Sequence, residues 1–232
     1  SMKIKGFQGT SLLDFPGRVA SQICFGGCKL TCPFCHNPTL VLDPEQYPDY
    51  PRDVVLDELK SRIPFIDGVV ISGGEPTLDP QCINLLRDIK ALGLAIKLDT
   101  NGLKPDMLKK LMAEALVDYI ALDLKTAPGR YGELHNAPVD LDALPRVIRM
   151  ILEGPVDYEF RTTCVPGFVG FDDVRLMGEA IRGARRWVFQ QFLAEHSLDD
   201  KLQELESYPE ETIRQYAEIG ERYADEVSIR GI

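Results

Sequence analysis

The chain has 232 residues, 44% of them hydrophobic, which is enough for one large α/β domain with an ordinary core. Its formal net charge of −10, from 36 acidic and 26 basic residues, argues against broad nucleic-acid binding, because that function normally needs a basic surplus. No apolar run reaches the roughly 18 residues of a membrane-spanning helix, and the N-terminus has no signal-peptide pattern. We therefore expect a cytoplasmic protein that binds neither membrane nor nucleic acid.

Short apolar runs with strand character alternate along the chain with segments whose apolar residues repeat every three to four positions, as in helices. The predicted strands are 19–25, 69–72, 94–98, 119–122, 158–163, 187–192 and 227–230. The predicted helices are 52–63, 81–92, 105–116, 141–152, 171–183 and 210–223. This alternation implies a parallel sheet with helical crossovers.

Six or so such units are fewer than the eight of a closed barrel, so the predicted fold class is α/β, an open, partial (β/α)6 barrel. We expect one domain over residues 1–232, with a short N-terminal extension at 1–18 and a closing helix and strand over 209–232. In parallel sheets of this kind, ligands collect at the carboxyl ends of the strands. The polar segments after the first four strands are therefore the candidate site.

Three cysteines, Cys28, Cys32 and Cys35, stand close together in the loop after the first predicted strand. Three thiolates can hold three corners of a cubane iron–sulfur cluster and leave the fourth iron open to another ligand. A cluster that only transfers electrons normally has four cysteines. An open metal position is what catalysis needs, so the loop indicates an enzyme.

Structural zinc is the alternative for this loop, but it normally takes four ligands in two separated pairs. No second pair follows, and His36 is an unfavourable fourth ligand because it adjoins Cys35. The remaining cysteines are isolated along the chain and are expected to be buried thiols rather than ligands: Cys24, Cys82 and Cys164.

The C-x3-C-x2-C spacing, with Phe34 just before the last cysteine, resembles the radical S-adenosylmethionine enzymes. The resemblance implies that the three cysteines bind a catalytic [4Fe–4S] cluster and that S-adenosylmethionine binds the fourth iron, with Phe34 beside the cofactor. It also implies the chemistry: the reduced cluster passes an electron to the sulfonium, and the resulting 5′-deoxyadenosyl radical abstracts a hydrogen atom from the substrate.

The segment 72–76, Ser-Gly-Gly-Glu-Pro, follows the second predicted strand. Glycines and proline mark turns anywhere, so a plain turn is one interpretation. Glycines also let a backbone approach a ligand closely, and a carboxylate can pair with an ammonium. By resemblance to the same family, Gly73, Gly74 and Glu75 hold the amino group of the cofactor.

Two acidic strand ends follow, Asp99-Thr100-Asn101-Gly102 and Asp123-Leu124-Lys125. Aspartates at neighbouring strand ends repel each other unless a cation or a charged ligand lies between them. A surface pair of Asp123 with Lys125 is the alternative. These strings, with Cys-His-Asn at 35–37, are similar to the activase of pyruvate formate-lyase. That similarity implies a monovalent cation (Na⁺ or K⁺) at Asp99, Thr100 and Asp123, and cofactor contacts from Asp99 and Lys125.

His196 follows the sixth predicted strand, where the same activase has a histidine that touches the cofactor. The residues around it differ, so a lone exposed histidine is the alternative interpretation. The cofactor residues implied by resemblance are thus Phe34, Gly73, Gly74, Glu75, Asp99, Lys125 and His196.

The opening segment 9–17 and the closing segment 228–231 resemble the activating proteins of anaerobic ribonucleoside-triphosphate reductase. This resemblance implies a glycyl radical enzyme as partner, with that reductase as the expected one, and flavodoxin or ferredoxin as electron donor. A radical enzyme acting on a small molecule or nucleoside, such as a pterin-like substrate, is the alternative. A non-catalytic iron–sulfur or zinc protein is a third possibility and leaves the glycine and aspartate segments unexplained.

Overall fold

A computed structural model describes residues 3–28, 30–35, 38–197 and 199–232, with only the backbone described at His196. The chain divides into two compact units. The first unit consists of Ser1–Lys29, Thr39–Thr100 and Asp106–Ile120, and the second of Leu30–Pro38, Asn101–Pro105 and Ala121–Ile232. The single domain expected over residues 1–232 stays a prediction.

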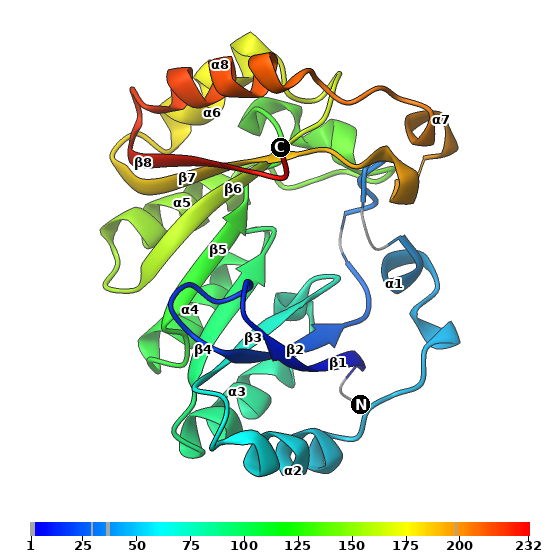
Figure 1. The fold of residues 1–232 in the computed structure, drawn as a ribbon, viewed down its shortest axis with the longest axis vertical. Helices are drawn as coiled ribbons and strands as arrows, with labels where there is room; N and C mark the ends of the chain where they lie inside the picture. The colour runs from blue at the N-terminus through cyan, green and yellow to red at the C-terminus, as the bar shows by residue number, and fades with distance from the viewer. Residues whose placement is uncertain (1–2, 29, 36–37, 198) are drawn as a thin grey trace. The chain divides into compact units, whose positions relative to one another are not determined.

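The eight-stranded sheet confirms the predicted α/β class (Figure 1). Its order follows the chain from β1 to β8, so the first and last strands are not neighbours and the order does not close. The strands are β1 (Ile4–Ser11), β2 (Ala20–Phe25), β3 (Gly68–Gly73), β4 (Ala95–Thr100), β5 (Tyr119–Asp123), β6 (Asp157–Cys164), β7 (Ala184–Gln191) and β8 (Ala224–Arg230). The β2–β3, β3–β4, β6–β7 and β7–β8 pairs are parallel, as the alternation of elements predicts.

The six predicted helices are present, with ends that differ by a few residues from the apolar pattern. They are α2 (Arg52–Arg62), α3 (Cys82–Ala91), α4 (Pro105–Ala113), α5 (Ala143–Glu153), α6 (Phe171–Ala180) and α8 (Glu210–Gly220). Two short helices were not predicted, α1 (Pro38–Leu42) and α7 (Asp200–Gln203). Within the described ranges, no helix is both long and apolar enough to cross a bilayer.

Strand β1 occupies the segment where the sequence predicts only an extension. It pairs antiparallel with β2, with Phe7 opposite Ile23 and Ser11 opposite Ala20. Two glycines and several polar residues interrupt its apolar alternation, so the sequence carries no clear strand signal there. Pairing with β2 supplies the backbone hydrogen bonds that stabilise it, and those partners are distant in sequence.

In the first unit, the parallel registers stack three rows of side chains on one face of the sheet. Ala20, Gly68 and Ala95 share the first row; Gln22, Val70 and Lys97 share the second. Cys24 and Ser72 are paired in the third row, and Asp99 lies two residues beyond Lys97. Because side chains alternate along a strand, residues two apart share a face. We call this face, which carries Gln22, Cys24 and Lys97, the inner face of the first unit; it is apolar at the start of the strands and polar at their carboxyl ends.

Phe15, from the loop between β1 and β2, closes the amino-terminal end of this face. It is buried and belongs to an apolar cluster with Ala20, Val70, Ala95 and Tyr119. Its ring centroid lies 6.2 Å from that of Tyr119. A side chain at Gly68 would overlap the Phe15 ring, which explains why glycine stands there. Phe15 therefore closes the amino-terminal end of this face with an apolar side chain. This contact gives one residue of the segment 9–17 a structural role.

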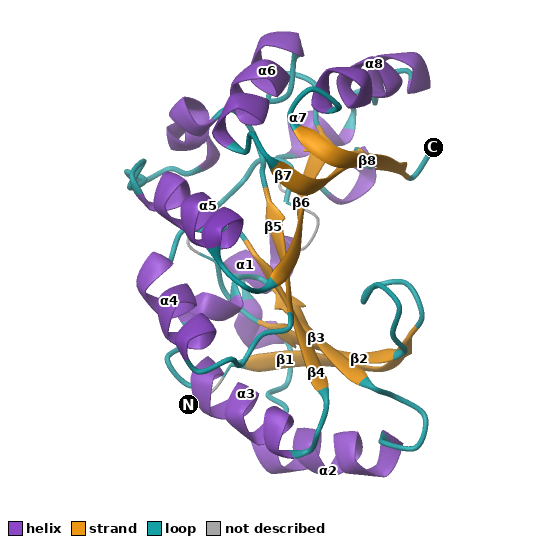
Figure 2. Cartoon of the chain, turned by 90° about the vertical axis from the view of Figure 1, so that its left-hand side faces the viewer, coloured by secondary structure: helices purple, strands orange, loops and turns teal. Residues whose placement is uncertain are grey.

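In the second unit, α6 and α8 pack on each other, and α8 packs on β7 and β8 (Figure 2). The buried face of these strands carries Trp187 and Phe189, whose ring centroids are 4.5 Å apart, and Trp187 donates a 2.9 Å hydrogen bond to Thr162. Burying rings of this size supplies much of the stability of such a layer. The opposite face of β6 carries Arg161, which pairs with Asp123.

Candidate active site

The glycine turn after β3 is hydrogen-bonded to the backbone that leads into Cys28. Gly74 N donates to Phe25 O (2.8 Å), and Glu75 N donates to Gly27 O (2.7 Å). Gly73 has φ +111°, and a side chain there would overlap the Phe25 backbone. A side chain at Gly74 would overlap the Gly27 carbonyl. The two glycines are thus required by a close backbone approach that fixes the entrance of the cysteine loop.

Glu75 is buried, with 2% of its surface exposed, and its carboxylate joins this turn to the end of β4. Its Oε2 accepts hydrogen bonds from Thr77 Oγ1 (3.1 Å) and Thr100 Oγ1 (2.9 Å). A buried carboxylate needs such donors to remain charged. The glycine turn and the Asp99-Thr100 strand end, which the sequence predicts as site residues, are therefore brought together within the first unit.

Asp99 has a basic partner that the sequence analysis missed. Lys97 Nζ lies 2.8 Å from Asp99 Oδ1, and the exposed fractions of the two side chains are 2% and 13%. Both residues lie on the same face of β4 because they are two positions apart. This alternation was readable in the sequence and could have identified Lys97 as a site residue.

Cys32 and Cys35 belong to the second unit and form one tight turn, in which Cys35 N donates to Cys32 O (3.0 Å). Phe34 between them is buried and packs edge-on against Phe168, with centroids 5.0 Å apart. Lys125 Nζ lies 5.9 Å from the Phe34 ring centroid. These contacts bring four predicted site residues close together within the second unit: Cys32, Phe34, Cys35 and Lys125.

The turn after β5 is held by Tyr131, a residue that carries no signal in the sequence. Its buried hydroxyl accepts a hydrogen bond from Lys125 N (3.0 Å) and donates one to Asp123 O (3.3 Å). The Asp123 side chain pairs with Arg161, whose Nη2 lies 3.1 Å from Asp123 Oδ1. The aspartate therefore has a basic partner from β6, in addition to any contact with Lys125 that the sequence suggests.

The surroundings of Cys32 raise the pKa of its thiol above the ordinary value. Burial raises the pKa of the Cys32 thiol; the Lys125 ammonium lowers this pKa, whereas Cys35 and Asp123 raise it. All six cysteines carry thiols rather than disulfides. A buried thiol with a nearby ammonium and a second thiol is a suitable donor for iron, because metal replaces the proton and removes the cost of burial.

The other cysteines behave largely as predicted. Cys82 and Cys164 are fully buried, whereas Cys24 is half-buried on the inner face of β2. The predictions for His36 and Asn37 lie outside the described residues, as does the prediction for the side chain of His196. The cysteine loop is also tied to the region after β7, since Asp199 N donates to Pro33 O (2.8 Å).

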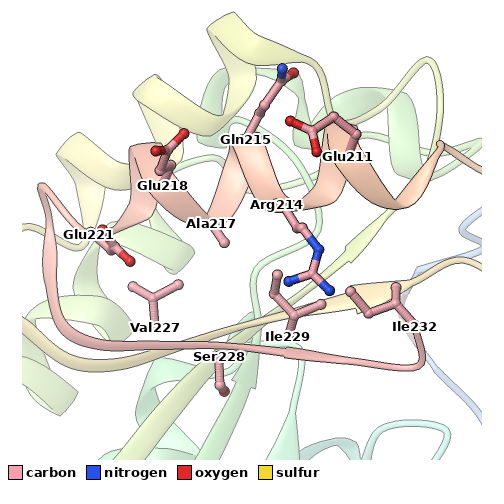
Figure 3. Close-up of a pocket in the computed structure, with 10 residues that line it drawn as sticks. All are labelled: Glu211, Arg214, Gln215, Ala217, Glu218, Glu221, Val227, Ser228, Ile229 and Ile232. Carbon is pink, nitrogen blue, oxygen red and sulfur yellow. The ribbon is translucent and has the colours of Figure 1, made fainter.

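A pocket of about 600 Å³ lies between α8 and β8. Figure 3 shows Val227 and Ile229 directed from β8 toward α8, while Ser228 points to the other side. Glu218 and Glu221 line it from the helix. None of the predicted cluster, cofactor or cation residues lines this pocket, so it is separate from the candidate active site.

Cysteine thiols, a glycine turn and charged side chains at the carboxyl ends of parallel strands are the features of an α/β enzyme with a metal-centred cofactor. Residues 23–175 match the sequence profile of the radical SAM superfamily. The chain therefore belongs to the radical SAM superfamily, whose members use a [4Fe–4S] cluster and S-adenosylmethionine.

Several relatives cover the chain to different extents. A protein of Methanocaldococcus jannaschii, provisionally named as a glycyl-radical enzyme activating enzyme, is 30% identical over 99% of this chain and 96% of its own length. Pyruvate formate-lyase-activating enzyme of Clostridium pasteurianum is 29% identical over 53% of this chain and 52% of its own. The 7-carboxy-7-deazaguanine synthase of Haemophilus influenzae is 34% identical over 44% of this chain and 42% of its own.

Solved structures share the fold at low sequence identity. Streptococcus suis SuiB bound to S-adenosylmethionine aligns with a TM-score of 0.68 and 18% identity, over 88% of this chain and 48% of that protein. A domain of pyruvate-formate lyase-activating enzyme from Bacteroides vulgatus aligns with a TM-score of 0.57 and 21% identity, over 71% of this chain and 99% of the domain. These likenesses confirm the predicted fold class, the partial barrel of the radical SAM enzymes.

Proposed function

We propose that this radical SAM enzyme is an activase that generates a glycyl radical on a partner protein. The observation that carries the proposal is the similarity to the Methanocaldococcus jannaschii activating enzyme, which extends over 99% of this chain. In this proposal Cys28, Cys32 and Cys35, which form no disulfides, would be the ligands of a cluster with one open iron, as the chemistry requires. The protein's own part is to bind, orient and shield the reacting atoms.

Residues of the cysteine loop and of the strand ends would perform this task. Cys28, Cys32 and Cys35 would hold the cluster, and Gly73, Gly74 and Glu75 would hold the amino end of S-adenosylmethionine. Asp99 and Lys125 would contact the cofactor. When bound, the cluster and cofactor supply one-electron cleavage of the sulfonium and a 5′-deoxyadenosyl radical that takes a hydrogen atom from glycine. The roles of Phe34 and His196 at the cofactor, and of a monovalent cation at Asp99, Thr100 and Asp123, stay predictions.

The expected partner is an anaerobic ribonucleoside-triphosphate reductase, with flavodoxin or ferredoxin as electron donor and the cytoplasm as location. The test is an anaerobic mixture of cluster-loaded protein, a reductant, S-adenosylmethionine and the reductase. Electron paramagnetic resonance should reveal a glycyl radical on the reductase, and Cys32→Ala protein should give none. A reductase with its radical glycine replaced by alanine is the matched control. Cofactor cleavage without any radical on this partner or on other glycyl radical enzymes would contradict the proposal.

A small-molecule substrate is the second candidate, favoured by the partial similarity to 7-carboxy-7-deazaguanine synthase. That similarity covers 44% of this chain, against 99% for the activating enzyme. The two candidates differ in where the abstracted hydrogen originates. With a deuterated glycine loop in the partner, an activase transfers deuterium into 5′-deoxyadenosine, whereas a small-molecule enzyme forms this product only when its own substrate is added.

A further inference from the structure

The acidic strand ends of this chain are already accompanied by basic side chains. Lys97, in the middle of β4, is 2% exposed, and its ammonium lies 2.8 Å from Asp99 Oδ1. Lys97 lies at the position of β4 that pairs with Val70 of β3, which in turn pairs with Gln22 of β2. Its side chain extends along the same face of the sheet toward Asp99, two residues closer to the carboxyl end of β4. A lysine side chain is rarely fully buried unless its ammonium is paired, so the burial of Lys97 depends on its ion pair with Asp99.

The other residues expected to bind a monovalent cation also have protein partners. The Thr100 hydroxyl donates a hydrogen bond to Glu75 Oε2 at 2.9 Å. In the second unit, Asp123 pairs with Arg161 at 3.1 Å. Each of the two aspartates therefore has a cationic side chain at hydrogen-bond distance. The repulsion between carboxylates was the reason to expect an added cation. Basic partners offset this repulsion, so that reason no longer requires a metal ion.

We propose that Lys97 is the resident cation of Asp99: its ammonium neutralises and orients the carboxylate, so that S-adenosylmethionine binds without an added alkali metal ion. Lys97 is a positioning residue that acts through Asp99, and the part that concerns the cofactor rests on the proposed function. An alkali ion at Asp99 would lie close to the ammonium and be repelled by it. Lysine is a compact charge with three donors, so it can satisfy Asp99 and still donate to a neighbouring oxygen.

The experiment compares the wild-type protein with Lys97→Met, a substitution that keeps a long, unbranched side chain and removes the positive charge. Potassium chloride is replaced stepwise by choline chloride at constant ionic strength. Two readouts are followed: the melting temperature of the cluster-free protein, and the dissociation constant of S-adenosylmethionine for the cluster-loaded protein. Wild type should give the same values in both salts. Lys97→Met should bind the cofactor about tenfold or more weakly in choline, and potassium should restore affinity and raise its melting temperature.

Two further variants keep the result interpretable. Lys109→Met replaces an exposed lysine of α4 and should match wild type in both salts. Lys97→Met with Asp99→Asn removes both charges; it should regain the melting temperature lost in Lys97→Met and respond to neither salt. A wild-type protein whose melting temperature and cofactor affinity both rise in potassium would overturn the proposal. If no variant binds S-adenosylmethionine at all, the proposed function fails, while the melting temperatures still decide the role of Lys97.

Discussion

The Thr100 hydroxyl donates a 2.9 Å hydrogen bond to Oε2 of Glu75, and this bond joins the ends of two neighbouring segments of the predicted site. Glu75 closes the glycine turn after β3, and Thr100 is the last residue of β4. Thr77 donates to the same oxygen at 3.1 Å. A carboxylate so buried depends on these donors, so its orientation is determined by Thr100 as well as by its own turn.

Thr100→Val should therefore destabilise the cluster-free protein, because it removes a donor from a buried carboxylate and leaves a side chain of nearly the same volume. We expect a loss of about 1–3 kcal/mol in the free energy of unfolding, measured by urea titration. Thr100→Ser retains the hydroxyl and should lose less than half as much. Equal losses in the two variants would assign the effect to packing instead of the hydrogen bond.

The second prediction concerns the glycine turn. Gly74→Ala places a methyl group against the Gly27 carbonyl, so the backbone before Cys28 must shift. We expect about 1–3 kcal/mol of destabilisation and a lower iron content after anaerobic reconstitution. Gly129→Ala is the matched control, since nothing lies within 4 Å of the added atom there. Normal iron content and stability in Gly74→Ala would show that the two segments do not depend on each other.

The sequence was sufficient to predict the strands whose apolar runs are continuous, and the polar segments at their ends. It failed at β1, where Gly6 and Gly9 interrupt the pattern and pairing with β2 provides the missing stability. For the glycine pair the sequence allows either a plain turn or a ligand contact; the structure adds that a Cβ at Gly74 would overlap the Gly27 carbonyl. Such backbone approaches between distant segments have no local signature, because they depend on the register of the sheet.

The same limitation applies to the partners of the site residues. Arg161 lies 38 positions from Asp123 in the sequence, and only the neighbouring strands β5 and β6 bring them together. Tyr131 is likewise identifiable only from the hydrogen bonds it makes with the turn after β5. Lys97 differs from both, because its two-residue spacing from Asp99 in a predicted strand already places the two side chains on one face.

Cys32→Ala should abolish cluster assembly, since two remaining thiolates cannot hold a cubane with one open iron. Iron and sulfide analysis after reconstitution, together with the visible absorption of the cluster, measures this outcome. Cys164→Ala removes a thiol that is fully buried elsewhere in the second unit and should retain wild-type iron content. A full iron complement in Cys32→Ala would exclude this cysteine as a ligand.

Asp123→Ala should instead spare the cluster and weaken the binding of S-adenosylmethionine. Loss of a hydrogen bond to a charged group corresponds to about 10–100-fold in the dissociation constant. Equilibrium dialysis of the cluster-loaded variant measures the affinity, and the iron content of the same sample provides the comparison. Loss of iron from Asp123→Ala would show that this aspartate supports the cluster itself and not the binding of S-adenosylmethionine.

The last prediction concerns the half-buried thiol on the inner face of β2. Burial, followed by the carboxylates of Asp99 and Asp14, raises the pKa of Cys24 to about 11. Since only the thiolate is alkylated, the rate of Cys24 modification in the cluster-free protein should rise about tenfold per pH unit from pH 7 to 10. Peptide mapping after iodoacetamide treatment follows this residue separately from the loop cysteines.

Asp99→Asn tests the electrostatic part of that shift. It removes one of the negative charges that disfavour the thiolate, so the pKa of Cys24 should decrease and alkylation at pH 8 should become faster. In urea-unfolded protein the rate should level off near pH 9, the ordinary range of a thiol. A folded-state rate that already levels off at pH 9 would mean that Cys24 is neither buried nor near Asp99, and the inner face of the first unit would need to be reassigned.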